Sequence, residues 1–218
     1  MSLTNRRGRP REGRPHYGRL KHLNEETKKK ITDYQVRAFM AFARSIRPGW
    51  RADLLAGALI SPLKLIGVRK EVARRNITLC FPEKDKAERE KILAESYESM
   101  IWTGVEMLAW QHDPTLIDRM IVEQNGVENI KKALAEGRGA VLFSAHLGSW
   151  ELGAAWCSRH FPFHGLVRHS DSPFQKKLIE TLRERSGLRT ISKDTSMKRV
   201  ITLLRHNETI GVLADQHW

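Results

Sequence analysis

The spacing of apolar and polar positions divides the chain into a helical first half and a second half in which helices and strands alternate. In residues 84–110 apolar side chains recur every three or four positions, which predicts the longest helix of the chain. From residue 127 onward, short apolar runs typical of strands alternate with amphipathic segments, and turn residues lie between them. The predicted helices cover residues 127–136, 150–160, 173–186 and 196–207, and the predicted strands cover 140–145, 165–168, 188–192 and 209–214.

This alternation determines the predicted fold class. Strands joined through single helices form βαβ units, whose strands are parallel and whose crossovers are right-handed. We therefore expect an α/β fold with a mostly parallel sheet flanked by helices, preceded by an N-terminal helical region that associates with a membrane and by a basic disordered tail. The expected division is a tail at residues 1–33, membrane-associating helices at 34–70 and an α/β domain at 71–218.

Two N-terminal segments suggest attachment to a membrane. Residues 33–47 carry apolar side chains on one face and arginines elsewhere, which is typical of an interfacial helix and equally of a surface helix packed on a core. Residues 54–63 are apolar but short and contain Pro62, whereas a spanning helix needs about 20 apolar residues. We therefore expect attachment to one side of a membrane in preference to a crossing.

The positive charge of the chain indicates that it binds an anionic partner. The formal net charge is +13, and the first thirty residues hold ten lysines and arginines against three glutamates. Such an excess favours nucleic acid, a phospholipid surface or an acidic protein as partner. Residues 7–10 (RGRP) and 13–15 (GRP) resemble the core of a minor-groove arm. A solvated tail or a tether to lipid phosphates is the favoured interpretation, and nucleic acid is not an expected partner.

The sequence lacks the motifs that characterise several classes of functional site. The two cysteines provide no disulfide framework and suit a reducing compartment. The histidines are scattered without metal-ligand spacing, and no glycine-rich nucleotide fingerprint or GxSxG elbow occurs. We therefore expect neither a metal nor a cofactor, and a serine hydrolase is disfavoured.

Residues 138–152 contain a candidate general base and a carboxylate that could orient it. Residues 140–143 read as a buried strand, and His146 comes where it ends. Gly148 and Ser149 then supply a turn and a helix N-cap, which places Glu151 in the first helical turn. We expect Glu151 to fold back onto His146, fix its tautomer and raise its basicity, as a general base acting on a hydroxyl requires.

Four predicted strands deliver polar residues to one edge of the sheet, because the carboxyl ends of parallel strands lie on the same side. These residues are His146, Arg168, the pair Ser192 and Lys193, and Asp215. A histidine base beside an arginine is suited to moving an acyl group onto a hydroxyl close to a negatively charged group.

Four segments in order resemble the lipid A biosynthesis late acyltransferase family. They are residues 73–90 (ARRNITLCFPEKDKAERE), 143–151 (FSAHLGSWE), 166–173 (LVRHSDSP) and 211–216 (GVLADQ), and the resemblance covers about residues 36–218. His146 and Glu151 match the family's catalytic positions, and Ser149 stands where the family has asparagine. Arg168 matches the family's arginine block, although the tyrosine before it and the asparagine of that block are absent.

The resemblance implies an enzyme on the cytoplasmic face of a bacterial inner membrane. Its partners would be an acyl carrier protein thioester, a Kdo-bearing lipid A precursor and anionic inner-membrane lipids, and it needs no cofactor or metal. His146 would act as base with Glu151 orienting it, and Arg168 would hold a phosphate or the acceptor glycan. Ser149 and Asp215 are candidate substrate contacts, while Asp215 is equally suited to pinning the loops at its strand end.

The chain departs from this family at both ends, which leaves alternatives open. Its membrane segment is weak, and it stops directly after the predicted strand 209–214. We therefore expect a C-terminal truncation and little activity. The rival interpretations are an acyltransferase for another membrane glycolipid or glycerophosphate, a non-enzymatic nucleic-acid-binding protein, and a truncated pseudo-enzyme.

Overall fold

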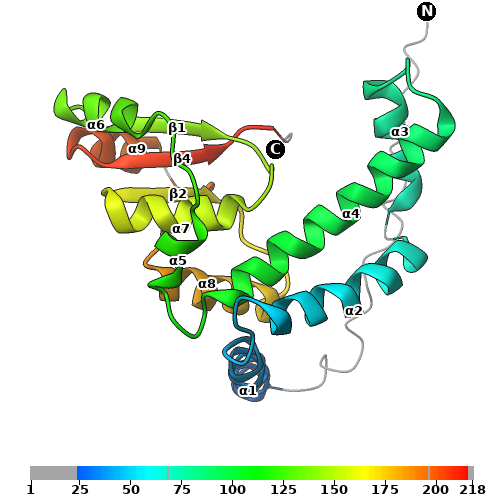
Figure 1. Ribbon diagram of the computed structural model, residues 1–218. Helices are drawn as coiled ribbons and strands as arrows, with labels where there is room; N and C mark the ends of the chain where they lie inside the picture. Colours follow the sequence, from blue (N-terminus) through cyan, green and yellow to red (C-terminus); the bar gives the residue numbers. More distant parts are fainter. Residues whose placement is uncertain (1–23, 68, 196, 216–218) are drawn as a thin grey trace, which may run out of the picture.

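The computed structural model describes residues 24–67, 69–195 and 197–215, where helices surround a parallel sheet (Figure 1). The helices are α1 (Glu25–Ala43), α2 (Trp50–Ile66), α3 (Lys70–Cys80), α4 (Lys86–Ala109), α5 (Leu116–Met120), α6 (Val127–Ala135), α7 (Trp150–His160), α8 (Pro173–Ser186) and α9 (Met197–Arg205). The strands are β1 (Ala140–Ser144), β2 (Phe163–Val167), β3 (Arg189–Ser192) and β4 (Thr209–Leu213). The α/β class and the parallel sheet predicted from the sequence are confirmed.

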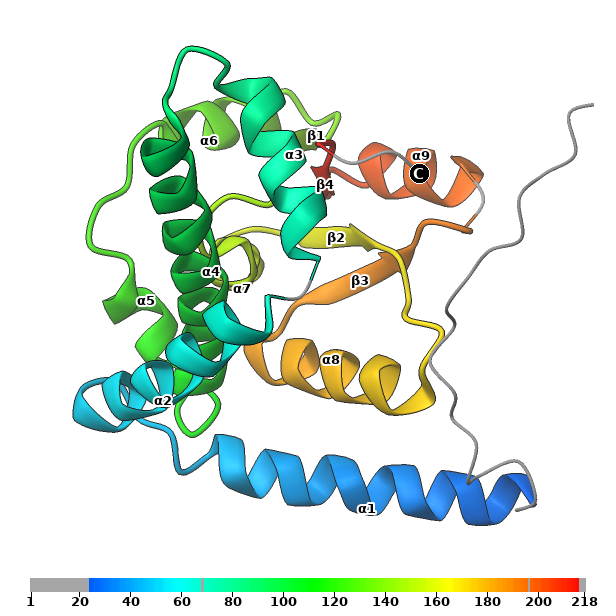
Figure 2. The same ribbon diagram turned by 90° about the vertical axis from the view of Figure 1, so that its right-hand side faces the viewer.

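The strands lie in the order β1-β4-β2-β3, and every neighbouring pair is parallel. Helix α7 connects β1 to β2, and α8 connects β2 to β3 at the far edge of the sheet. Helix α9 then connects β3 to β4 in the opposite direction, so that β4 lies between β1 and β2. Right-handed crossovers that run in opposite directions place their helices on opposite faces of a sheet. Figure 2 shows α7 and α9 on opposite sides of the sheet accordingly.

The strand β1 lies at an edge of the sheet, so the expectation that residues 140–143 form a buried strand is wrong. Phe143 is 72% exposed and Val141 is 44% exposed, while Leu142 between them faces the core side and is half-buried. A continuous apolar run does not show whether a strand lies inside a sheet or at its edge. Here β4, the last strand in the described residues, takes the inner position beside β1.

The first helix begins within the segment predicted as a disordered tail. Asn24 caps α1 by accepting a hydrogen bond from the Thr27 amide at 2.7 Å, and Glu25 and Glu26 favour the positive end of the helix. Residues 25–33 are therefore helical, which corrects the expected tail boundary. The arginine-rich sequences at residues 7–10 and 13–15 lie outside the described residues.

The apolar face of α1 packs on the α/β domain. Val36 and Met40 are buried and belong to the same core cluster as Leu178 and Leu182 of α8. Of the two interpretations that the sequence left open for this face, the described contacts match a surface helix packed on a core.

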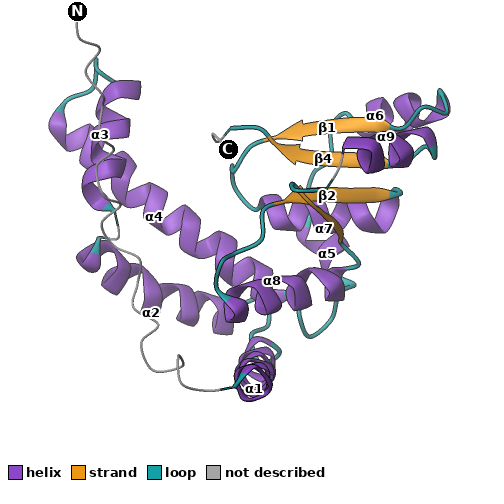
Figure 3. Ribbon diagram, turned by 180° about the vertical axis from the view of Figure 1, so that it is seen from behind, coloured by secondary structure: helices purple, strands orange, loops and turns teal. Residues whose placement is uncertain are grey.

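Helices α2, α3 and α4 form an arm that extends away from the sheet (Figures 1 and 3). Ala52 and Ala56 of α2 are buried against Ile101 and Val105 of α4. Other large apolar side chains of the arm are exposed, among them Trp50, Leu54, Ile66, Leu79 and Met100. Across the described parts of the chain, no helix combines the length and the apolar character that a membrane crossing requires.

Candidate active site

The register of the sheet places His146 and Asp215 side by side. Ser144 at the end of β1 pairs with Leu213 at the end of β4, so the segments that follow leave the sheet together. The carboxyl ends of these strands face the arm formed by α2, α3 and α4 (Figure 1). Two polar residues far apart in the sequence are thereby adjacent at the edge where parallel sheets bind ligands.

His146 is held by Asp215 through two hydrogen bonds. The ring Nδ1–H donates to Asp215 Oδ1 at 2.9 Å, and the His146 backbone N–H donates to Oδ2 at 3.0 Å. Both bonds lower the pKa of the Asp215 carboxyl below its usual value, and the bond from the His146 ring has the largest effect. An ionised carboxylate only accepts hydrogen bonds, so in the neutral form of the ring the proton lies on Nδ1 and the lone pair on Nε2. The His146 side chain is 28% exposed, which leaves the ring accessible.

The loop that carries His146 is supported from two sides. Gly148 has a φ of +54°, a left-handed conformation that a larger residue adopts only with strain. The Gly148 carbonyl accepts a hydrogen bond from the buried Thr103 hydroxyl of α4 at 3.0 Å. The Trp150 ring lies edge-on to the His146 ring with 5.0 Å between centroids. The sequence did not predict a role for Thr103, because its hydrogen bond to the loop joins residues that are far apart along the chain.

Glu151 has a different partner from the one expected. Arg183 of α8 donates to both of its carboxylate oxygens, with Nε–H at 3.1 Å from Oε2 and Nη2–H bound to Oε1. Both side chains are largely buried, 11% exposed for Glu151 and 19% for Arg183. The structure therefore pairs His146 with Asp215 and Glu151 with Arg183. The expected fold-back of Glu151 fails because the first turn of α7 faces α8, whereas the His146 loop lies beside the end of β4.

The remaining candidates occupy the same edge without joining this pair. Ser149 takes the N-cap position of α7, but its side chain makes no capping bond, and its Oγ is buried with no hydrogen-bond partner in the described structure. Arg168 follows β2 and is exposed, and no recorded hydrogen bond or ion pair within residues 24–67, 69–195 and 197–215 joins it to His146 or Asp215. Ser192 ends β3, and Lys193 donates its backbone N–H to the Val167 carbonyl at 2.8 Å.

An apolar cavity of about 240 Å³ lies between α7 and the sheet. We call it the α7 cavity. Its wall on the sheet comes mainly from alternate residues of three strands, because every second side chain of a strand points to the same face, and Leu166 and Val212 between them line it as well. The alternate residues are Leu142 and Ser144 of β1, Phe163, Gly165 and Val167 of β2, and Gly211 and Leu213 of β4. Trp150 lines the cavity and contacts His146, and Glu151 and Arg183 line it as well.

Gly211 makes room for the Phe163 ring in the wall of this cavity. A Cβ atom at this position would lie 2.3 Å from the Phe163 ring, so no larger residue fits without moving Phe163. The wall of the α7 cavity thus depends on a glycine in a strand, because only a residue without a side chain lets the Phe163 ring come this close.

Cys157 of α7 lines the same cavity and should react slowly with thiol reagents. Burial raises the pKa of its thiol from 9.0 to about 11, which makes the reactive thiolate about a hundredfold rarer. We expect Cys157 to be labelled at least about a hundredfold more slowly than the exposed Cys80, as measured with Ellman's reagent in single-cysteine variants. Equal rates in the native protein would contradict the burial of Cys157, and rapid labelling of Cys157 in denaturant is the control.

Comparison with known proteins adds independent observations. The model of the bacterial lipid A biosynthesis acyltransferase family matches residues 25–218. A lipid A biosynthesis acyltransferase of Haemophilus influenzae is 33% identical over 167 residues, covering 74% of this chain and 51% of that protein. From Escherichia coli, a lipid A biosynthesis lauroyltransferase is 29% identical over 72% of this chain and 51% of its own length. A palmitoleoyltransferase from the same organism is 27% identical over 74% and 52% respectively. The chain thus spans about half the length of these relatives.

Proposed function

Because this chain belongs to the bacterial lipid A biosynthesis acyltransferase family, we propose that it moves a fatty acyl chain from an acyl carrier protein thioester to a hydroxyl of a Kdo-bearing lipid A precursor. Two of the matched relatives are named for the transfer of a lauroyl or a palmitoleoyl group. The observation that carries the proposal is the His146–Asp215 pair beside an apolar cavity.

In the proposed reaction His146 acts as the general base. Its Nε2 removes the proton from the acceptor hydroxyl while the hydroxyl oxygen attacks the thioester carbonyl. The C–S bond then breaks, the new ester C–O bond remains, and the leaving thiolate takes the proton from the imidazolium. Asp215 orients the ring through Nδ1–H and stabilises the imidazolium during the transfer. The amides of the first turn of α7, which have no partners within the helix, are candidate donors to the oxyanion.

The surrounding residues have proposed roles in binding. The acyl chain would enter the α7 cavity, whose lining is mostly apolar. The buried Ser149 hydroxyl, which lacks a partner in the described structure, would hydrogen-bond a polar group of a substrate. Arg168 would hold a phosphate or the acceptor glycan through charge-assisted hydrogen bonds. Glu151 acts in this proposal by holding α7 against α8 through Arg183.

We further propose that the protein works on the cytoplasmic face of the inner membrane. The exposed apolar side chains of the α2–α4 arm, together with the net charge of +13, suit contact with an anionic lipid surface. This arm stands opposite the carboxyl ends of β1 and β4 (Figure 1), so a membrane bound there would bring lipid substrates to His146.

An acyl-transfer assay with matched donors and acceptors tests the proposed donor and acceptor. Protein from the complete natural reading frame is supplied with one acyl chain as a carrier-protein thioester or as a coenzyme A thioester. The acceptors are the Kdo-bearing lipid A precursor, the same precursor without Kdo, and glycerol 3-phosphate. We expect transfer from the carrier protein to the Kdo-bearing precursor to be fastest. Preferred transfer to glycerol 3-phosphate would replace this proposal with the glycerophosphate alternative.

A further inference from the structure

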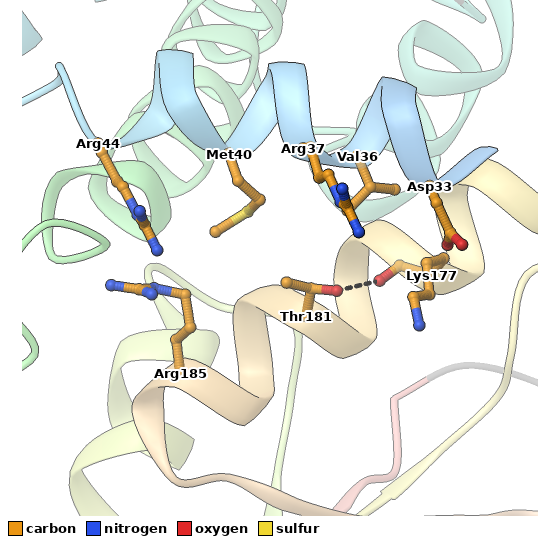
Figure 4. A pocket seen from close by; sticks show the side chains of 8 residues that line it. All are labelled: Asp33, Val36, Arg37, Met40, Arg44, Lys177, Thr181 and Arg185. Carbon is orange, nitrogen blue, oxygen red and sulfur yellow. Dashed lines mark hydrogen bonds between the residues drawn. The ribbon is translucent and has the colours of Figure 1, made fainter. Parts of the chain in front are cut away.

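A second cavity, of about 400 Å³, lies between α1 and α8, and we call it the α1–α8 cavity (Figure 4). Arg37 and Arg44 reach it from α1, and Lys177 and Arg185 reach it from α8. Its other lining residues are Asp33, Val36, Met40 and Thr181. Four basic groups therefore share this space with one carboxylate.

Helical spacing explains why these side chains meet. Residues 33, 37 and 40 of α1 and its C-cap residue 44 recur at intervals of three and four, so they lie on one face of this helix. Residues 177, 181 and 185 recur at intervals of four on α8 and likewise share a face. Val36 and Met40 are buried and fix the distance between the helices. The basic groups are thus held around the cavity by a packed interface.

In the described structure, the four positive charges of the cavity exceed its single negative charge, that of Asp33. Arg44 and Arg185 point toward one another with no carboxylate between them (Figure 4). Arg185 is anchored because its Nε–H and Nη2–H donate to the Gln111 carbonyl at 3.2 and 2.5 Å. Burial, and next to it the charge of Arg44, lower the pKa of Arg185. No ion pair is recorded in residues 24–67, 69–195 and 197–215 for Arg37, Arg44 or Lys177.

We propose that the α1–α8 cavity binds a phosphate group, supplied either by a small phosphate compound or by the headgroup of an anionic phospholipid. Guanidinium groups present planar N–H donors that match phosphate oxygens, and a lysine adds a point charge. An anion between Arg44 and Arg185 would turn their repulsion into two attractions. The cavity lies on the α1 side of α8, whereas Arg183 of that helix contacts Glu151. The proposed phosphate site can therefore be tested independently of the acyl-transfer mechanism.

The test compares two double variants that lose the same charge. Arg37→Gln/Arg44→Gln removes two exposed arginines of the cavity while keeping Arg185 and its bond to Gln111. Arg119→Gln/Arg205→Gln removes two exposed arginines from α5 and α9. Binding of inorganic phosphate is measured by isothermal titration calorimetry, and binding to vesicles of phosphatidylcholine with or without phosphatidylglycerol by flotation. Circular dichroism checks that both variants are folded.

We expect the cavity variant to bind phosphate or phosphatidylglycerol vesicles at least about tenfold more weakly than the unmodified chain, because each lost charge-assisted hydrogen bond contributes about this factor. The control variant should stay within about twofold. Loss of phosphate binding identifies a site for small phosphate compounds, and loss of vesicle binding alone identifies a lipid headgroup site. Equal losses in both variants, or no binding by the unmodified chain to either probe, would overturn the proposal.

Discussion

Replacing His146 by alanine is expected to lower the rate of acyl transfer by about 10²–10⁴-fold, the usual contribution of a general base. Asp215→Asn should produce a large loss as well. The asparagine amide can donate to Nδ1, which would move the ring proton to Nε2 and remove the lone pair that the reaction needs. Both variants should keep the fold, because the two side chains are partly exposed at the ends of strands. Initial rates with the carrier-protein donor measure the effect.

Asp194→Asn is the matched control for this experiment. Asp194 is exposed and follows β3 at the same edge of the sheet, so its replacement removes the same charge without touching His146. We expect its rate to remain close to that of the unmodified enzyme. If Asp215→Asn left transfer unchanged while Glu151→Gln abolished it without unfolding the protein, Glu151 would be the orienting carboxylate and our reassignment wrong.

The second large effect is expected on stability. Glu151→Gln should lower the free energy of unfolding by about 3–5 kcal/mol, because it leaves the charge of the largely buried Arg183 without its partner. For a chain of this length, that corresponds to a drop in Tm of about 6–20 °C. Urea unfolding followed by circular dichroism measures the free energy, and a thermal scan measures Tm.

Two further variants distinguish the effect of losing a buried charge on stability from the effect of losing an exposed one. Glu95→Gln removes one partner of the exposed Lys91–Glu95 pair, whose charged atoms are 3.9 Å apart, and should change stability by less than about 1 kcal/mol. Glu151→Gln/Arg183→Met removes both buried charges and should recover much of the loss caused by Glu151→Gln. A Glu151→Gln protein as stable as the unmodified chain would refute the structural role of this pair.

Much of the fold was predictable because its signals are local. The periodicity in residues 84–110 predicted the helix that the structure shows as α4, which starts at a capping box formed by Asp85 and Glu88. Alternating periods after residue 127 predicted the parallel strands, since helix and strand patterns differ over short windows. The position of His146 directly after a strand followed from the same local reasoning.

The partners of these residues depended on contacts between distant segments. The sequence predicted that His146 and Asp215 share one edge of the sheet, but only the insertion of β4 beside β1 makes them neighbours. The same insertion leaves Phe143 exposed on the edge strand. Strand order follows from the packing of several crossovers at once, which no local pattern encodes.

By itself, then, the sequence determined the alternating elements after residue 127, their parallel arrangement and the polar residues that follow the strands, because each of these follows from short-range spacing and residue type. The tertiary structure decided which carboxylate meets His146, how Glu151 is neutralised by Arg183, and where four basic groups gather between α1 and α8. Hydrogen bonds and salt bridges form only where their atoms come within a few ångströms of one another. Their partners are therefore chosen by how the helices dock on the sheet, and docking is decided by the burial of apolar faces across the whole chain.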